Sequence, residues 1–189
     1  RLASKGVFVV WCHPSRIIND DIQYGYLSAV LCQNTPMWSC WRRTPELSIA
    51  LMDEWESKIE MLAQSTIPED VTSISGVPTW TMILMKRILE TTGKSTLKEV
   101  WPNLELYIHG GVSFLPYRDQ FKKIIGEGCT YLEMYNASEG FFSAQDNPDE
   151  DGMLLFLSHG IFYEFMPVEE YGKPDPKTIG LNDVEIGKN

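Results

Sequence analysis

Positive charge is scarce in this chain of 189 residues, where 16 Lys and Arg stand against 26 Asp and Glu and give a formal net charge of −10. Proteins that grip nucleic-acid phosphates do so with Lys and Arg, so this balance argues against an electrostatic nucleic-acid binder. No apolar run approaches the roughly 18 residues of a membrane span, and no basic-then-apolar leader opens the sequence. We therefore expect neither nucleic acid nor membrane as a partner.

Metal-binding and disulfide-forming residues are also few. The chain has 4 cysteines and 3 histidines, at Cys12, Cys32, Cys40, Cys129, His13, His109 and His159. No two cysteines stand in a C-x-x-C arrangement, so the spacing fits neither a disulfide scaffold nor a zinc site. The sequence predicts reduced thiols in a cytoplasmic protein.

Apolar residues are plentiful, at 43% of the chain with 12% aromatic, which is enough for one domain with a sizeable core. The first residue is Arg1 rather than Met, and we expect the chain to be a piece of a longer protein. Near residue 44, Thr44-Pro45 is typical of a helix N-cap followed by proline. Apolar residues then recur at helical spacing as far as Leu62, which predicts one amphipathic helix of about five turns.

From residue 71 the pattern alternates between short strands and helices. Strands are predicted over Val71 to Ile74, Leu104 to Ile108 and Thr130 to Met134, and helices over residues 79–92, closed by Gly93, and 116–125. This order predicts an α/β fold in which a parallel β-sheet is linked by crossover helices. Beyond Gly140 the residues 153–157 and 161–166 are predicted to form a β-hairpin.

Three turns should share the edge of this sheet where its parallel strands end, the edge at which open α/β sheets bind ligands. They are Ser75 to Pro78, His109-Gly110-Gly111 and Tyr135 to Gly140. Without a Cβ, the paired glycines would let a flat ligand approach the backbone. An ordinary strand-to-helix turn explains the glycines equally well.

The stretch from Tyr135 to Gly140, YNASEG, combines three kinds of chemistry. Tyr135 could stack on a base, Ser138 could donate to a phosphate, and Glu139 is an oxygen ligand of the kind Mg²⁺ takes when it also holds phosphates. An exposed tyrosine and a solvated glutamate in a plain loop are the alternative.

Two other motifs fit their functional patterns poorly. Gly93-Lys94-Ser95 has the ending of a phosphate-binding P-loop, but Ile88 stands where another glycine is needed, and the motif follows a helix. Glu133 and Glu139 could form a glycosidase pair, but alternation along the strand would point Glu133 away from the site edge.

Several ordered blocks together resemble the acyl-adenylating superfamily, which includes luciferases and acyl-CoA ligases. They are SISGVPTW, EVWPNLELYIHGGVSFLPYRDQF, YNASEGFF and GIFYEFMPVEE, with WRRTPELSIALMDEWE in support. Within the superfamily, the sequences of these blocks are similar to those of the auxin-responsive acyl-acid amido synthetases and their bacterial relatives. The likeness runs from about Tyr24 to Lys188.

The resemblance implies a two-step ligase that uses ATP and Mg²⁺. A small carboxylic acid would form an acyl adenylate, and an amino acid would then displace AMP to form an amide. By resemblance, Tyr135 packs on adenine with Asn136 and Ala137 beside it, Ser138 lies near the α-phosphate, and Glu139 binds Mg²⁺. Gly110 and Gly111 match the turn that lines the nucleotide and acyl site.

The family's phosphate loop should precede Val77-Pro78, and neither it nor the later arginine–aspartate block and C-terminal domain is in this chain. We therefore expect residues 1–189 to be the central part of a large N-terminal adenylating domain, inactive without the missing parts of its parent chain. The alternatives are a non-catalytic remnant that binds a nucleotide or a protein partner, and an acyl-CoA ligase.

Overall fold

The computed structural model describes residues 7–10, 15–19, 22–185 and 187. The chain divides into two units, Arg1–Leu155 and Phe156–Asn189. The first unit contains the sheet, the helices and the core, and the second is a small segment without a core of its own among the described residues.

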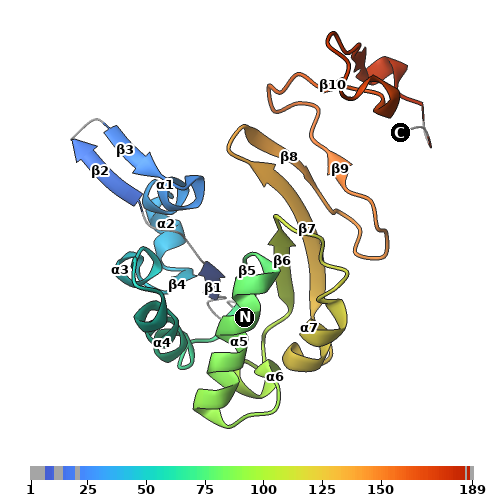
Figure 1. Ribbon diagram of the computed structural model, residues 1–189. Coiled ribbons are helices and arrows are strands. Elements are labelled where there is room, and N and C mark those ends of the chain that lie inside the picture. The colour runs from blue at the N-terminus through green and yellow to red at the C-terminus, as the bar shows by residue number, and fades with distance from the viewer. Residues whose placement is uncertain (1–6, 11–14, 20–21, 186, 188–189) are drawn as a thin grey trace. The chain divides into compact units, whose positions relative to one another are not determined.

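One sheet organises the first unit (Figure 1). Within the described residues it has seven strands in the order β4-β1-β5-β6-β7-β8-β9. β4, β1, β5, β6 and β7 run parallel, and β8 and β9 are added antiparallel. The bounds are β1 Val7–Val10, β4 Arg43–Thr44, β5 Val71–Ser75, β6 Leu106–Gly110, β7 Thr130–Ala137, β8 Gly140–Ala144 and β9 Leu154–Leu155. A separate antiparallel pair is formed by β2 Ser15–Asn19 and β3 Ile22–Gly25.

Helices connect these strands. They are α1 Leu27–Gln33, α2 Met37–Cys40, α3 Leu47–Ala50, α4 Trp55–Thr66, α5 Pro78–Thr92, α6 Leu97–Val100 and α7 Arg118–Ile125. α5 links β5 to β6, and α7 links β6 to β7. The predicted α/β fold is therefore confirmed, with a parallel β-sheet and crossover helices at the expected places in the chain.

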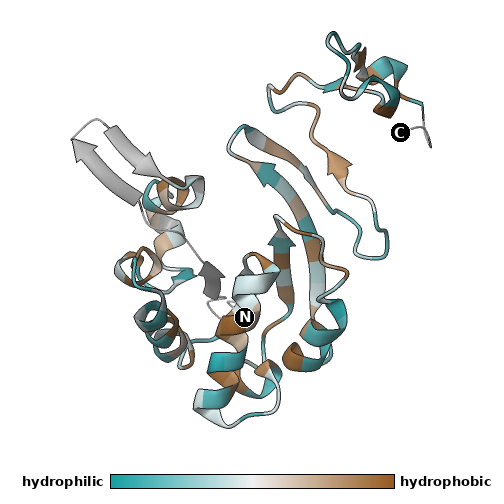
Figure 2. Ribbon diagram, in the orientation of Figure 1, coloured by the Kyte–Doolittle hydropathy of each residue, from teal (hydrophilic) through white to brown (hydrophobic). Residues whose placement is uncertain are grey.

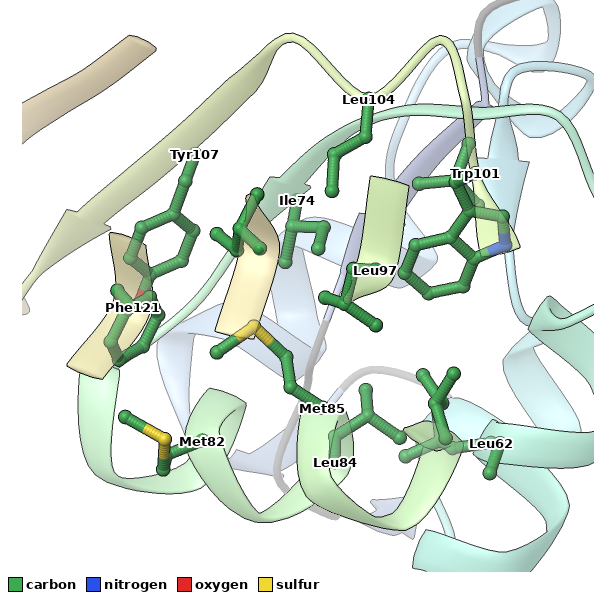
Figure 3. Packing of buried hydrophobic residues seen from close by; sticks show 14 of the residues in the cluster. Leu62, Ile74, Met82, Leu84, Met85, Leu97, Trp101, Leu104, Tyr107 and Phe121 are labelled. Atoms are coloured by element: carbon green, nitrogen blue, oxygen red, sulfur yellow. The ribbon is translucent and has the colours of Figure 1, made fainter. Parts of the chain in front are cut away.

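The core lies between α5, α6, α7 and one face of the sheet. Ile74, Tyr107 and Tyr131 are partners across β5, β6 and β7, so their side chains share that face. In Figure 3, Met85 of α5 and Phe121 of α7 pack with Ile74 and Tyr107 of this face in one cluster. Along α5 and α7, hydrophobic and hydrophilic residues alternate as expected for helices that cover a sheet (Figure 2).

The single helix expected after residue 45 is wrong, because the segment forms α3 and α4 with a break between them. The break has a local cause. The Glu54 carboxylate accepts hydrogen bonds from the backbone N–H groups of Glu56 (3.0 Å) and Ser57 (2.7 Å), so it caps a new helix. The expected cap at Thr44 is also wrong, since Thr44 lies in β4 and the N-cap of α3 is Glu46.

The hairpin expected between residues 153–157 and 161–166 does not form. β9 pairs with β8 in the first unit. In the second unit β10 (Glu164–Phe165) pairs with β11 (Ile179–Gly180), and short 3-10 helices cover Val168–Glu170 and Leu181–Asp183. Each of these strands has two residues, so its partner is set by contacts that local alternation does not encode.

The thiols differ in state. Cys40 and Cys129 are free, whereas Cys32 is disulfide-bonded, so the expectation that all the cysteines are reduced is wrong.

None of the helices in the described part of the chain reaches the length and apolarity that a membrane crossing requires.

The pairing of β6 with β7 leaves no room at Gly110. A Cβ placed there would overlap the carbonyl oxygen of its partner Met134, whereas one on Gly111 would meet nothing closer than Val77 Cγ2 at 3.5 Å. Gly111 instead has a φ of 80°, where a side chain costs about 1–2 kcal/mol.

We therefore expect Gly110→Ala to lower the free energy of unfolding by about 3 kcal/mol or more, because two strands must separate. Gly111→Ala should cost only about 1–2 kcal/mol. Urea unfolding midpoints of the two variants measure the difference. Equal losses would mean that the β6–β7 register is not as described.

Candidate functional site

The turns that follow β5 and β6 are joined at the edge of the sheet. The Tyr107 hydroxyl donates to the Gly76 carbonyl at 2.8 Å, and the Gly76 N–H donates to the Ile108 carbonyl at 3.1 Å. A Cβ added to Gly111 would lie 3.5 Å from Val77 Cγ2, so the two turns are close together. The structure thus brings the first two predicted turns together.

Strand β7 adds the third part of this edge. Gly110 pairs with Met134, and Asn136 Oδ1 lies 3.9 Å from the point where a Cβ of Gly110 would stand. Gly110, Gly111 and Asn136 are therefore neighbours. The close backbone contact at Gly110 explains why that position carries no side chain.

Tyr135 is accessible at this edge. Its side chain is 54% exposed, and its ring centroid lies 5.1 Å from that of Phe142 on β8. A large exposed aromatic face supported by a second ring is suited to stacking on a flat ligand. Ala137, half-buried, ends the strand two residues later.

Ser138 and Glu139 form the two-residue turn between β7 and β8, where Ala137 pairs with Gly140. Strand β7 thus runs three residues beyond the expected end at Met134, because β8 satisfies its backbone hydrogen bonds. Both turn residues are exposed. Their side chains stand at the tip of a hairpin, beyond the glycine turn.

A metal at Glu139 would need ligands from elsewhere. Among the residues that the structure describes, no group of three or more His, Cys, Asp and Glu side chains could hold a metal ion. A lone carboxylate does not fit a structural zinc or calcium cage. It does fit Mg²⁺, which commonly takes one or two carboxylates and fills its remaining positions with water and substrate phosphates.

The two rejected motifs are placed elsewhere. Gly93 ends α5 in the left-handed conformation, with φ 66°, and its N–H donates to Leu89 O at 2.8 Å, so it is a helix stop. Glu133 pairs with His109 across β6 and β7 and lines a cavity that Glu139 does not line. A glycosidase pair of the two glutamates therefore has no common site.

That cavity, which we call the α7 cavity, has a volume of about 580 Å³. It is lined by α7, the strands β6 and β7 and the β8–β9 loop, through His109, Ser113, Phe114, Leu115, Arg118, Lys122, Cys129, Thr130, Tyr131, Glu133, Gln145, Pro148, Asp149 and Asp151. None of the residues predicted for ATP or Mg²⁺ is among them.

Two polar atoms at the α7 cavity are buried without a partner. His109 is only 5% exposed, and its ring lies on Phe114 with centroids 4.0 Å apart. Within the described part of the chain, neither His109 Nδ1 nor the Tyr131 hydroxyl has a hydrogen-bond partner. An unsatisfied buried polar group costs about 1–3 kcal/mol, so two of them at one cavity call for a physical reason.

The charge states of these groups follow from their surroundings. Burial, helped by the positive charge of Arg118, lowers the pKa of His109 from 6.5 to about 4, so the imidazole is neutral at pH 7. Burial raises the pKa of Tyr131 above its ordinary value, so its hydroxyl keeps its proton. Both buried groups are therefore uncharged at pH 7.

In the sequence, His109 is one of three scattered histidines and lies in a predicted turn. Strand alternation was the available signal, because Tyr107, His109, Tyr131 and Glu133 occupy alternate positions of two paired strands. What the sequence did not show is that α7 leaves His109 under a cavity rather than under a tightly packed core.

The lowered pKa of His109 predicts that the free energy of unfolding depends on pH. The folded pKa lies below the unfolded value, so the unfolded chain binds the extra proton between pH 6.5 and 4, and stability falls as pH falls through this window. The loss amounts to at most about 3 kcal/mol.

We expect His109→Asn to remove this component, giving a flatter dependence of the unfolding free energy between pH 6.5 and 4. The exposed His159 is the matched control, and His159→Asn should keep the wild-type slope. Denaturant unfolding at a series of pH values provides the measurement. A wild-type slope in His109→Asn would contradict the burial of this imidazole.

Comparison with known proteins places the chain. Residues 3–130 match the GH3 family N-terminal domain. The solved structure of a GH3.15 acyl acid amido synthetase superposes with a TM-score of 0.69 at 11% identity, covering 99% of this chain and 42% of that one. An open conformation of a 2-hydroxyisobutyryl-CoA ligase, in complex with 2-HIB-AMP and CoA, gives 0.51 at 13% identity, covering 80% and 30%. The chain thus spans less than half of either protein and shares their fold, and its match to the family domain shows that it belongs to the GH3 family.

Proposed function

We propose that the full-length protein is an ATP-dependent acyl-acid amido synthetase, which adenylates a small carboxylic acid and then forms an amide with an amino acid. One observation supports the proposal most directly. The Gly110-Gly111 turn lies beside β7, and β7 carries the exposed Tyr135 and ends at the exposed turn of Ser138 and Glu139. Membership of the GH3 family supports it. We place this chain in the larger, adenylating domain of that protein, and the protein in the cytoplasm, where ATP and free amino acids are abundant.

In this proposal the edge residues act by binding and orientation. The exposed ring of Tyr135 stacks on adenine, and the side-chain-free backbone of Gly110 and Gly111 lets the nucleotide lie close to the sheet. Ser138 donates a hydrogen bond to a phosphate oxygen. Glu139 holds Mg²⁺, which when bound offsets the charge that develops on the phosphates.

The reaction needs no nucleophile from the protein. The substrate carboxylate attacks the α-phosphorus and pyrophosphate leaves, and the amine of the second substrate then attacks the acyl carbon and AMP leaves. The chain's part is to hold the reacting groups in line and to neutralise charge, which are the main sources of catalysis in phosphoryl and nucleotidyl transfer.

An acyl-CoA ligase is the second candidate, favoured by the structural likeness to the CoA ligase described above. The two candidates share the adenylation step and differ in the nucleophile that accepts the acyl group. Mass spectrometry of the products formed with an amino acid or with coenzyme A separates them. A non-catalytic remnant would give neither product.

Replacement of the Glu139 carboxylate tests the proposal directly. In the full-length protein, Glu139→Gln keeps the shape of the side chain and removes its charge. We expect acid-dependent exchange of pyrophosphate into ATP to fall by about a hundredfold or more, since each 1.36 kcal/mol of lost transition-state stabilisation is a factor of about ten. Thermal stability should barely change, because Glu139 is exposed.

Glu127→Gln is the matched control, since Glu127 is an exposed carboxylate in the turn between α7 and β7. It should leave the exchange rate at the wild-type value. Full exchange activity of Glu139→Gln at saturating Mg²⁺ would refute the metal-binding role and leave the hairpin tip as a plain turn.

Tyr135 should affect binding rather than chemistry. We expect Tyr135→Ala to weaken ATP binding by about 1–3 kcal/mol, while Tyr135→Phe, which keeps the ring, binds ATP as the wild type does. Equilibrium titration with ATP measures both. Equal weakening in the two variants would assign the effect to the hydroxyl and not to stacking.

A further inference from the structure

A side chain of the hydrophobic core reaches the turn between β5 and α5. The Tyr107 hydroxyl donates to the Gly76 carbonyl oxygen at 2.8 Å, and the Tyr107 side chain is fully buried. Phe121 of α7 stacks on its ring with centroids 4.7 Å apart. Because packing holds the ring, the hydroxyl has a fixed position and in turn fixes the Gly76 carbonyl.

The other hydrogen bonds of this turn leave the Gly76 carbonyl unused. The Gly76 N–H donates to the Ile108 carbonyl at 3.1 Å, and the Thr81 N–H donates to the Val77 carbonyl at 3.0 Å. Among the residues that the structure describes, Tyr107 is the only donor to the Gly76 carbonyl oxygen. Without the hydroxyl this acceptor would lack a partner, which favours a displaced turn whose carbonyl meets water.

Val77 is the residue that a displaced turn would carry with it. It follows Gly76, and its Cγ2 atom lies 3.5 Å from the point where a Cβ of Gly111 would stand. In the proposed function the nucleotide lies against Gly110 and Gly111. A Val77 side chain that moves across these glycines would therefore occupy part of the space of the nucleotide.

We propose that Tyr107 is a positioning residue for nucleotide binding. It acts through the turn, because its own side chain is buried: the hydroxyl holds Gly76, so that Val77 stays beside Gly111 and the glycine turn remains open. The inference rests on the proposed function and adds to it a residue of the core. If the turn is held in only a fraction of the molecules, the apparent affinity for ATP falls by that fraction, while the reaction of bound ATP is unchanged.

Tyr107→Phe removes the hydroxyl and keeps the buried ring. In the full-length protein we expect KM for ATP in acid-dependent pyrophosphate exchange to rise about fivefold to tenfold, the shift that one lost hydrogen bond gives to an equilibrium. The value of kcat should stay within about twofold of the wild type. A purely structural role predicts the opposite, because partial unfolding lowers the concentration of active enzyme, and with it the apparent kcat, but leaves KM unchanged.

Tyr131→Phe is the matched control. Tyr131 pairs with Tyr107 across β6 and β7, and its buried hydroxyl has no hydrogen-bond partner in the described part of the chain. Loss of this hydroxyl should leave both KM and kcat at their wild-type values. A rise of KM in Tyr131→Phe equal to that in Tyr107→Phe would assign the effect to the core in general and overturn the proposal.

Trp101→Phe controls for lost stability. Trp101 is buried, and its Nε1 donates to the Thr66 carbonyl at 3.1 Å, ahead of the amino ends of β5 and β6. The variant loses a buried hydrogen bond away from the glycine turn. We expect a lower urea midpoint with an unchanged KM for ATP, and a raised KM would contradict the proposal.

A second substitution tests the part assigned to Val77. Val77→Ala shortens the side chain that would cover the glycines, so the double variant Tyr107→Phe/Val77→Ala should recover a KM for ATP within about twofold of the wild type. A double variant that keeps the raised KM would overturn the steric role of Val77.

These measurements separate the inference from the proposed function. A wild-type protein without acid-dependent exchange would refute the proposed function and the inference with it. An active wild type whose Tyr107→Phe variant has the same KM for ATP would refute the inference alone.

Discussion

The hydrogen bond from the Tyr107 hydroxyl to the Gly76 carbonyl, at 2.8 Å, joins the hydrophobic core to the edge of the sheet. The Tyr107 ring is fully buried on the central strand β6 and stacks on Phe121 of α7 with centroids 4.7 Å apart. Its hydroxyl emerges at the turn after β5. Because the ring is fixed by packing, the bond costs little additional conformational entropy, and it sets the turn after β5 relative to β6.

The remaining edge follows from the parallel pairing of β5, β6 and β7. The carboxyl ends of parallel strands lie at the same edge of a sheet, so the turns that follow β5, β6 and β7 lie close together there. The antiparallel strand β8 extends this geometry, since it keeps β7 in the sheet as far as Ala137 and lifts Ser138 and Glu139 to a hairpin tip. One sheet therefore supplies both a rigid backbone surface at Gly110 and an exposed polar tip.

The parts of this fold that the sequence predicted are those with strong local signals. Helix α5 has a proline in its first turn and Gly93 at its end, and the three central strands are short segments with β-branched, aromatic and other apolar residues between turns. The wrong predictions have identifiable causes. Glu54 caps α4 with two hydrogen bonds inside an apparently continuous helical pattern, and a charged residue on a polar helix face looks the same in sequence whether or not it caps.

Strand pairing between distant parts of the chain is the second feature that the sequence did not predict. The residues 153–157 and 161–166 have strand-like composition, but β9 and β10 pair with β8 and β11, a choice that depends on which backbone groups remain unpaired. At the candidate site, Gly110 and Glu139 were predicted by resemblance and stay predictions, whereas the predicted end of β7 lies three residues too early. The α7 cavity was not predicted, because the alternation that buries His109 is the same for any buried strand residue.

His109 and Gly110 are consecutive on β6, yet one lies beneath the α7 cavity and the other at the edge of the sheet. Alternation turns His109 to the helix-covered face, while Gly110 has no side chain and lies against the Met134 carbonyl with no slack. Even a methyl group at Gly110 would force β6 and β7 apart, so this contact fixes the spacing of the two strands at the edge of the sheet. The strand contact that leaves no side chain at Gly110 therefore also sets the position of His109 beneath the α7 cavity, because the two residues are consecutive on β6.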